Sequence, residues 1–181
     1  RHLHLRLHDL VLVALVIPPS PLDSLALPEG VFDRRGLECP VIRTRIRHEK
    51  SARDIAQRLA ASLEYVGVGA VEMFATKDGA ILVNEIAPRV HNSGHWTIDA
   101  CATDQFEQHI RAICYLPLGN TSRAFDVVME NLIGDEVDEW RCRLDAPMTK
   151  LHLYGKSAVR PGRKMGHVTT LTPIAPLPAR E

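Results

Sequence analysis

Two glutamates in neighbouring strand-like runs are well placed to do chemistry. Glu72 lies in GAVEMF and Glu85 in AILVNEI, and the turn-forming dipeptide Asp78-Gly79 separates the two runs. A two-residue hairpin loop at that dipeptide pairs Glu72 directly with Glu85 on one face of the sheet. Like charges so placed destabilise a sheet, so the pair either holds a divalent cation such as Mg²⁺ or faces basic residues on a solvated surface. Asn84 can join the pair if its strand bulges there.

A polar loop, RVHNSGHW, follows these glutamates in the sequence. Arg89, His91, Asn92 and Ser93 offer hydrogen-bond donors of the kind that hold an anionic group. The spacing of His91 and His95 is that of a zinc pair on a helix, but the Ser-Gly within the loop disfavours a helix and hence zinc. The alternative is an ordinary polar surface loop.

A basic segment lies near the C-terminal end. Residues 146–180 contain six Lys or Arg and no Asp or Glu. Lys156, Arg160, Arg163 and Lys164 surround a Pro-Gly turn, where cations and backbone N–H groups can converge on one phosphate. A nucleic-acid surface is disfavoured because Tyr154 is the only aromatic residue among them. A solvated basic face, balanced by the acidic residues 135–145, is the other reading.

The elements that must position these residues indicate an α+β fold. Helical spacing predicts a helix from the N-cap Ser51 to near Tyr65, whose apolar stripe is Ala52, Ile55, Ala56, Leu59, Ala60 and Leu63. A second helix is expected over 104–114, with Thr103 as its cap and Phe106, Ile110 and Ile113 facing inward.

Strands are expected at 10–17, near 126–133, and at 151–154 and 167–171. The apolar run Leu10 to Ile17 is too short to span a bilayer, and a strand is favoured over a targeting segment. The surrounding residues 1–45 are expected to form a poorly specified lead.

Composition is that of a globular domain. Hydrophobic residues make up 45% and charged residues 24%, and Lys+Arg and Asp+Glu are both 22, so the net charge is zero. This balance gives no indication of a nucleic-acid partner. The four cysteines form no CxxC pair, which predicts reduced thiols in a cytoplasmic protein, with Cys101 and Cys114 in the core.

Three segments together resemble one known family. EYVGVGAVEMF, LVNEIAPRVHNSGHWTIDACATDQFEQHIRAICYLPLG and HLYGKSAVRPGRKMGH are similar to the C-terminal half of 5-(carboxyamino)imidazole ribonucleotide synthase, an ATP-grasp enzyme of purine biosynthesis. The resemblance runs from Arg47 to Val168. It implies the C-terminal part of an ATP-grasp domain over 46–120, an antiparallel sheet with packed helices, and a small β-rich C-terminal domain over 121–181.

The resemblance also implies an activity and roles for site residues. Family members are ADP-forming ligases that use ATP, Mg²⁺ (or Mn²⁺) and bicarbonate to carboxylate 5-aminoimidazole ribonucleotide. The implied roles are metal ligation by Glu72 and Glu85, nucleotide binding by Asn84 and Glu85, contact with the carboxyphosphate by Arg89, His91 and Asn92, and binding of the ribonucleotide phosphate by Lys156, Arg160 and Arg163.

The chain is expected to represent the C-terminal portion of such an enzyme, with small-molecule substrates, a homodimeric complete form, and no nucleic-acid or membrane partner. Because half of the nucleotide contacts belong to segments that do not match here, the chain alone is expected to bind Mg-ATP weakly. Two alternatives stay open: another ATP-grasp ligase or transferase of the purine pathway, and a non-catalytic remnant that only associates with a partner.

Overall fold

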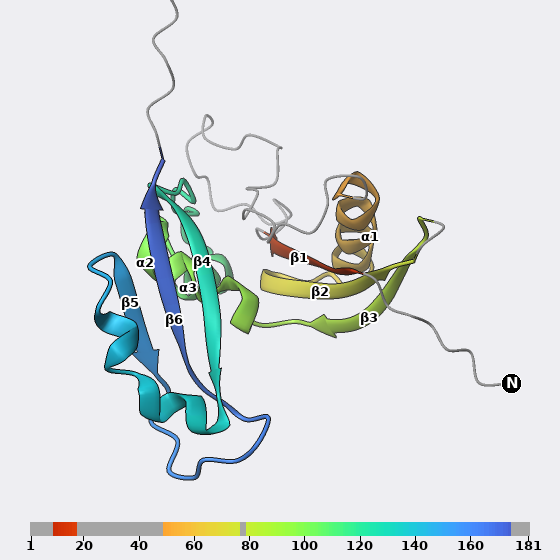
Figure 1. Cartoon of the computed structure of the whole chain (residues 1–181). Coiled ribbons are helices and arrows are strands. Elements are labelled where there is room, and N and C mark those ends of the chain that lie inside the picture. The colour runs from red at the N-terminus through yellow and green to blue at the C-terminus, as the bar shows by residue number, and fades with distance from the viewer. Residues whose placement is uncertain (1–8, 18–48, 77–78, 175–181) are drawn as a thin grey trace, which may run out of the picture. The chain divides into compact units, whose positions relative to one another are not determined.

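A computed structural model describes residues 9–17, 49–76 and 79–174, which form two compact units (Figure 1). The first unit comprises the described residues up to 95 together with 103–121, and the second comprises 96–102 together with the described residues from 122 onward. Each unit is built on its own three-stranded antiparallel sheet.

The expected α+β class is confirmed. The domain boundaries expected at residues 45 and 120 stay predictions, and residues 18–48, around the first of them, lie outside the described part of the chain. Within that part, no helix is both long and apolar enough to cross a membrane.

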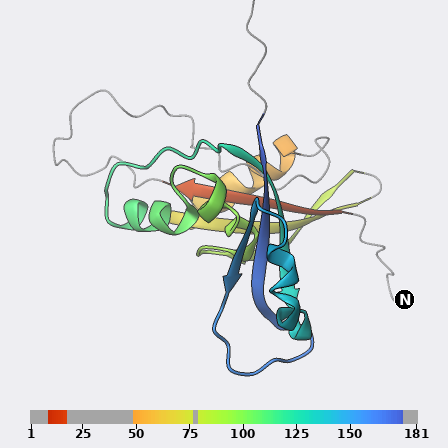
Figure 2. The same ribbon diagram turned by 60° about the vertical axis from the view of Figure 1, so that its left-hand side comes forward.

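The sheet of the first unit has the strand order β1-β2-β3. Strand β1 (Asp9–Ile17) confirms the strand expected in the N-terminal lead, and it pairs with β2 (Gly67–Ala75) along its whole length. Strand β3 (Ile81–Ala87) pairs with the other edge of β2. Helices α1 (Glu49–Ser62) and α3 (Gln105–Ile113) both pack against β1 and β2 (Figure 2).

The core of the first unit lies between α1 and the sheet. Ala52 and Ala56 of α1 are fully buried against Val71 and Met73 of β2, so the predicted apolar stripe is confirmed. Small side chains on the helix allow close approach to the sheet, and alternate residues of β2 face the same core. The helix nevertheless begins at Glu49, so the prediction that Ser51 is its cap is wrong. Leu63, at the other end of the stripe, is 59% exposed because it lies beyond the last helical turn.

Helix α1 ends in a Schellman motif. The amide of Tyr65 donates to the carbonyl of Ala60, and that of Glu64 donates to the carbonyl of Ala61. Glu64 adopts the left-handed conformation, with a φ of 47°, that this motif requires at the residue after the cap. The hydroxyl of Tyr65 then donates to the carbonyl of Val68, at 2.9 Å, and burial raises the pKa of this phenol.

The loop between β2 and β3 differs from the prediction. Thr76 and Ala80 pair through an amide-to-carbonyl bond of 2.9 Å, so three residues rather than two separate them. The amide of Gly79 donates to the carbonyl of Thr76, and Gly79 has a φ of 91°, as in a three-residue hairpin loop that closes with a left-handed glycine. The predicted two-residue turn is therefore wrong, and its Asp78 lies outside the described residues.

Helix α3 presents a different face to the core from the one predicted. Gln105, Gln108 and Ala112 are buried, whereas the residues expected inward are 40–53% exposed, namely Phe106, Ile110 and Ile113. The buried glutamines hydrogen-bond to backbone groups of neighbouring loops, and a side chain that satisfies such groups is favoured in the interior. Asp104, not Thr103, caps the helix, because its carboxylate accepts from the amides of Phe106 and Glu107.

The second unit contains α2 (Thr97–Ala100) and a sheet of order β4-β6-β5. The strands are β4 (Phe125–Ile133), β5 (Thr149–Leu153) and β6 (Lys164–Pro173), which confirms the strands expected in this region. The central strand β6 has five consecutive buried residues, 165–169, since it is paired on both edges. Trp96 and Ala100 pack with Leu171 in its core, and Cys101 lies against this cluster. Cys114, expected in the core, is exposed at the C-terminal cap of α3.

We expect Glu64→Gly to raise the free energy of unfolding by about 0.5–1 kcal/mol. Glycine adopts the left-handed conformation without the Cβ clash that costs other residues about 1–2 kcal/mol, although it also increases the entropy of the unfolded chain. Urea unfolding measures the change. The control Glu64→Gln keeps the left-handed residue and removes only a negative charge from the helix C-terminus, for which we expect about 0.3 kcal/mol. Equal gains from the two variants would refute the backbone argument.

Candidate functional site

Glu72 and Glu85 lie directly opposite one another across β2 and β3. The pairing predicted from the sequence is therefore confirmed, but it arises differently. The three-residue loop pairs Ala75 with Ile81 and Met73 with Val83, which is one position out of the predicted register. A β-bulge between Glu72 and Met73 restores the predicted register before Glu85 is reached.

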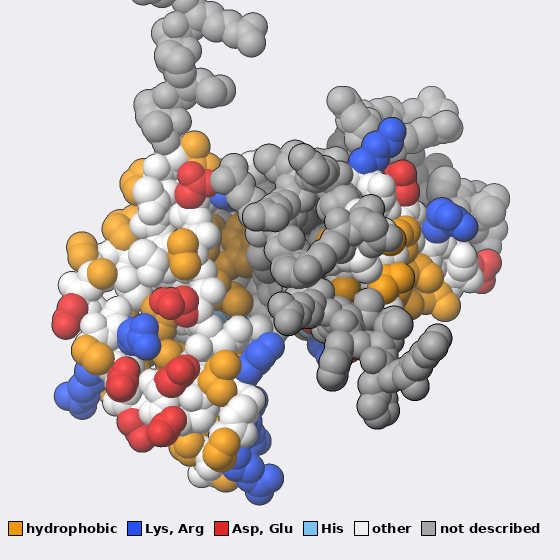
Figure 3. All heavy atoms as spheres, turned by 45° about the vertical axis from the view of Figure 1, so that its right-hand side comes forward, with side chains coloured by type: hydrophobic (Ala, Val, Ile, Leu, Met, Phe, Trp, Pro, Cys, Tyr) orange, Lys and Arg blue, Asp and Glu red, His pale blue; other side chains and the backbone are white. Residues whose placement is uncertain are grey.

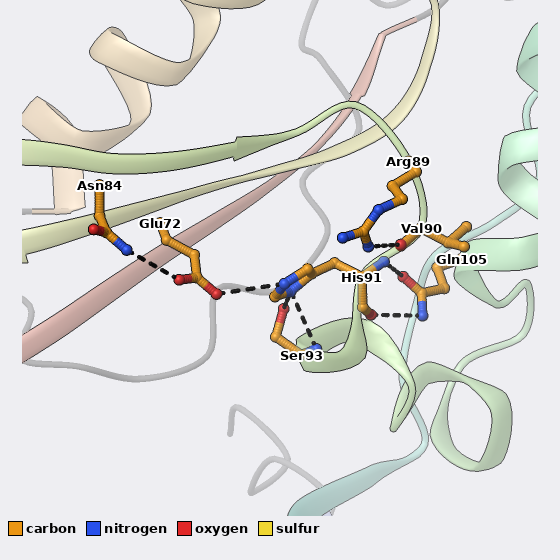
Figure 4. Close-up of polar contacts among 7 residues, drawn as sticks. All are labelled: Glu72, Asn84, Arg89, Val90, His91, Ser93 and Gln105. Atoms are coloured by element: carbon orange, nitrogen blue, oxygen red, sulfur yellow. Dashed lines mark hydrogen bonds and ion pairs between the residues drawn. The ribbon is translucent and has the colours of Figure 1, made fainter. Parts of the chain in front are cut away.

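Asn84 is the extra residue of that bulge. Its amide nitrogen lies 3.4 Å from a carboxylate oxygen of Glu72, so its side chain is on the same face of the sheet (Figure 4). Directly opposed residues in an antiparallel pair also share a face, which places Glu85 beside them. Carboxylate and amide oxygens are hard ligands of the kind that Mg²⁺ binds. The donor set on this face therefore fits a hard divalent cation.

His91 reaches the same carboxylate from the loop after β3. Its Nε2 lies 3.4 Å from Glu72 Oε1, and the side chains of His91 and Glu72 are 14% and 22% exposed. On the other side of the ring, Nδ1 contacts the hydroxyl of Ser93 at 2.8 Å and accepts from the Ser93 amide. With Nδ1 accepting, the ring proton is assigned to Nε2, the nitrogen that lies 3.4 Å from Glu72.

The neighbours of His91 in the loop are placed differently. The guanidinium of Arg89 donates to the carbonyl of Val90 at 3.1 Å, so it bends back along its own loop (Figure 4). Asn92 begins a short 3-10 helix (Asn92–Gly94). Asn84 and His91 thus both contact Glu72, while Arg89 contacts a backbone oxygen instead.

The sequence analysis did not identify the polar residues of α3 that hold this loop. The side-chain amide of Gln105 bonds to both backbone groups of His91, and Nδ1 of His109 accepts from the amide of Val68 at the start of β2. Gln105, Gln108, His109 and Ala112 follow the same helical spacing as an apolar core stripe. Polar side chains at the helical spacing of a core stripe are the signal that could have identified the buried face.

The basic residues predicted to bind a phosphate, Lys156, Arg160 and Arg163, lie in the connection between β5 and β6. Lys156 donates to the carbonyl of Lys164 at 2.5 Å and lies 5.3 Å from the centre of the Tyr154 ring. Arg163 donates to the carbonyl of Ala158 at 2.9 Å, and Arg160 is exposed. Figure 3 shows basic side chains along the lower margin of this part of the surface, close to acidic ones.

A second polar cluster lies inside the same unit. Nε2 of His152 on β5 contacts both carboxylate oxygens of Asp99 on α2, at 2.9 and 3.1 Å. The His152 ring stacks on that of the buried His167, with centroids 4.6 Å apart, and Nδ1 of His167 contacts the hydroxyl of Tyr154 at 2.9 Å.

The geometry of this cluster favours a hydrogen-bonded network over a metal site. One ligand atom from each of Asp99, His152 and His167 lies within 4.8 Å of the others. The two imidazole rings are within 16° of parallel, however, so their in-plane lone pairs run side by side rather than converging on one ion.

Two family models match the chain. The ATP-grasp domain matches residues 38–106, and the phosphoribosylaminoimidazole carboxylase C-terminal domain matches residues 127–175. N5-carboxyaminoimidazole ribonucleotide synthase from Brucella melitensis is 57% identical over 124 residues, covering 68% of this chain and 34% of that protein. The Bacillus subtilis protein of the same name is 53% identical over 125 residues, covering 67% and 32%. The chain thus spans about a third of the length of these relatives.

Solved structures agree with these matches. The crystal structure of N5-carboxyaminoimidazole ribonucleotide synthetase from Thermotoga maritima has a TM-score of 0.72 and 39% identity, covering 93% of this chain and 48% of that one. A structure of N5-carboxyaminoimidazole synthase from Aspergillus clavatus in complex with ADP and 5-aminoimidazole ribonucleotide has a TM-score of 0.67 and 32% identity, covering 92% and 47%.

The sheet that carries Glu72 and Glu85, followed by the β-rich second unit, defines the C-terminal part of an ATP-grasp protein. Within that class, the chain belongs to the N5-carboxyaminoimidazole ribonucleotide synthase family, and it represents part of such a protein.

We expect the contact between Asp99 and His152 to couple their contributions to stability by about 1 kcal/mol, because the carboxylate is only 10% exposed. A double-mutant cycle of Asp99→Ala and His152→Ala, followed by urea unfolding, measures this coupling. The control cycle on the more exposed pair Arg123 and Asp126 should give less than about 0.5 kcal/mol. A coupling between Asp99 and His152 no larger than that of the control pair would contradict the expectation.

Proposed function

We propose that the protein containing this chain carboxylates 5-aminoimidazole ribonucleotide in purine biosynthesis, with ATP and bicarbonate as co-substrates and ADP as product. The observation that carries the proposal is the constellation of Glu72, Asn84 and His91 on one face of β2 and β3, with Glu85 opposite Glu72. It occurs in a chain that is 32% identical to a protein crystallised with ADP and 5-aminoimidazole ribonucleotide.

Each predicted site residue of the first unit has a role in this proposal. Glu72, Glu85 and the side-chain oxygen of Asn84 would hold Mg²⁺ or Mn²⁺ beside the phosphates of ATP. The cation supplies positive charge that neutralises phosphate oxygens during phosphoryl transfer. His91 presents its Nε2 proton beside the same carboxylate, where it can hydrogen-bond to an anionic intermediate. Arg89 and Asn92 act on the same intermediate, and Arg89 must then leave the carbonyl of Val90.

The basic loop of the second unit is proposed to bind the 5′-phosphate of the ribonucleotide. The side chains of Lys156 and Arg163 already donate hydrogen bonds to backbone carbonyls. Little side-chain entropy is therefore lost when they bind an anion. Arg160 is exposed and can contribute the additional charge. We also propose a cytoplasmic location, since the three cysteines in the described residues are free thiols, and a homodimeric complete enzyme.

We expect Mn²⁺ to bind at the glutamate pair and Glu85→Gln to weaken that binding about tenfold, because affinity follows the number of charged ligands. Paramagnetic broadening of amide signals in an NMR titration measures both the position and the affinity. Glu64→Gln is the matched control, since it removes a carboxylate of the same unit that does not lie on the sheet. Broadening centred elsewhere, or equal affinities for the two variants, would rule out the metal site.

We expect Arg163→Ala to raise the KM for 5-aminoimidazole ribonucleotide about ten- to a hundredfold while the KM for ATP changes little, since one charge-assisted hydrogen bond is lost. Steady-state kinetics can be measured on a chimera in which this chain replaces the matching residues of the Brucella melitensis relative. Lys150→Ala removes a cation of the same segment that lies on β5, and it should leave both constants unchanged.

A change in the KM for ATP alone would assign the basic loop to the nucleotide instead. A chimera that folds but makes no ADP in response to 5-aminoimidazole ribonucleotide and bicarbonate would overturn the proposed function itself.

A further inference from the structure

Gln105 holds the backbone of His91 by two hydrogen bonds. Its Oε1 accepts from the amide of His91 at 3.0 Å, and its Nε2 donates to the carbonyl of His91 at 2.9 Å. The same Nε2 lies 2.7 Å from Nδ1 of His95. A side-chain amide thus substitutes for a neighbouring strand, and it satisfies both peptide groups of a residue that lies outside the sheet (Figure 4).

The position of Gln105 is itself tightly determined. It is the first residue of α3 and only 4% exposed, and the preceding residue, Asp104, caps the helix with two hydrogen bonds. Gly94 lies so close that a Cβ atom there would be 2.5 Å from Oε1 of Gln105. Because a buried amide with this many partners has few other rotamers available, it transmits the position of the helix to the loop.

The position of Gln105 bears on the contact between His91 and Glu72. The imidazole of His91 is fixed at Nδ1 by Ser93, which is local, but the loop that carries both residues is connected to α3 through Gln105. Inside the loop, the amide of Gly94 also donates to the carbonyl of His91 at 2.9 Å, which shapes the turn, whereas the bonds of Gln105 tie that turn to α3 and so set where Nε2 lies relative to the carboxylate.

We propose that Gln105 is a positioning residue that holds the Nε2 proton of His91 against the carboxylate of Glu72. Its use in carboxylation rests on the proposed function, whereas the positioning itself does not.

Gln108 provides a matched control on the same helix. It is 1% exposed, and its side-chain amide makes the same two-way pair of bonds, here with the amide and carbonyl of Gly119, at 2.8 and 2.9 Å. Gln105→Leu and Gln108→Leu therefore each remove a pair of bonds to one loop residue from a buried site, and Gln105→Leu also removes the contact with His95. Only the first removes a contact of His91.

The test is NMR spectroscopy of the full chain, following the ring signals of His91 in the wild type and in each leucine variant. Glu72→Gln is introduced into each background, so that the shift of the His91 ring signals reports the Glu72 contact. We expect a clear Glu72-dependent shift in the wild type and in Gln108→Leu, and its loss in Gln105→Leu. The measurement involves neither ATP nor turnover, so a failure of the proposed function leaves this result interpretable.

Gly94→Ala is the second variant, in case Gln105→Leu does not fold. Its methyl group displaces the Gln105 amide while leaving the glutamine in place, and it should also abolish the Glu72-dependent shift. The proposal is overturned if the shift persists in Gln105→Leu or Gly94→Ala. It is also overturned if Gln108→Leu removes the shift equally, because the effect would then reflect general loosening of the helix.

Discussion

The direct opposition of two carboxylates across β2 and β3 is the constraint on which the rest of the first unit depends. Glu72 and Glu85 repel each other in this register. The structure offsets this repulsion locally. The bulge at Asn84 places an amide against Glu72 from one side, and His91 approaches the same carboxylate from the loop. A cation bound at this face would complete that compensation, which links the stability of the hairpin to its proposed chemistry.

The hairpin loop and the bulge depend on one another. A three-residue loop moves the register by one position, and the extra residue in β3 moves it back before Glu85. If the loop were shortened to two residues while the bulge stayed in place, Glu72 would no longer face Glu85. A β-bulge re-aims the side chains of its strand, and here it brings Glu85 opposite Glu72.

The loops of both units are held by side chains that bond to the backbone. Gln105 and Gln108 bond to loop peptides in the first unit, whereas Lys156 and Arg163 bond to carbonyls of their own loop in the second. Loops lack the regular partners of a sheet, so buried amides and anchored cations supply them. Such loops are organised before a ligand arrives, and binding then costs less conformational entropy.

The sequence alone identified the family, the apolar stripe of α1, the strands and the pairing of Glu72 with Glu85, because each depends on local periodicity or on contiguous motifs. Only the tertiary structure decided that α3 buries its glutamines and exposes Phe106 and Ile110, and that Asp99 meets His152. The sequence likewise did not reveal the three-residue loop or the bulge. Each of them shifts the strand register by one position, and the two shifts cancel before Glu85. The physical reason is that periodicity reports which side chains avoid water, whereas the buried face of a helix is also chosen by distant backbone groups that need hydrogen-bond partners.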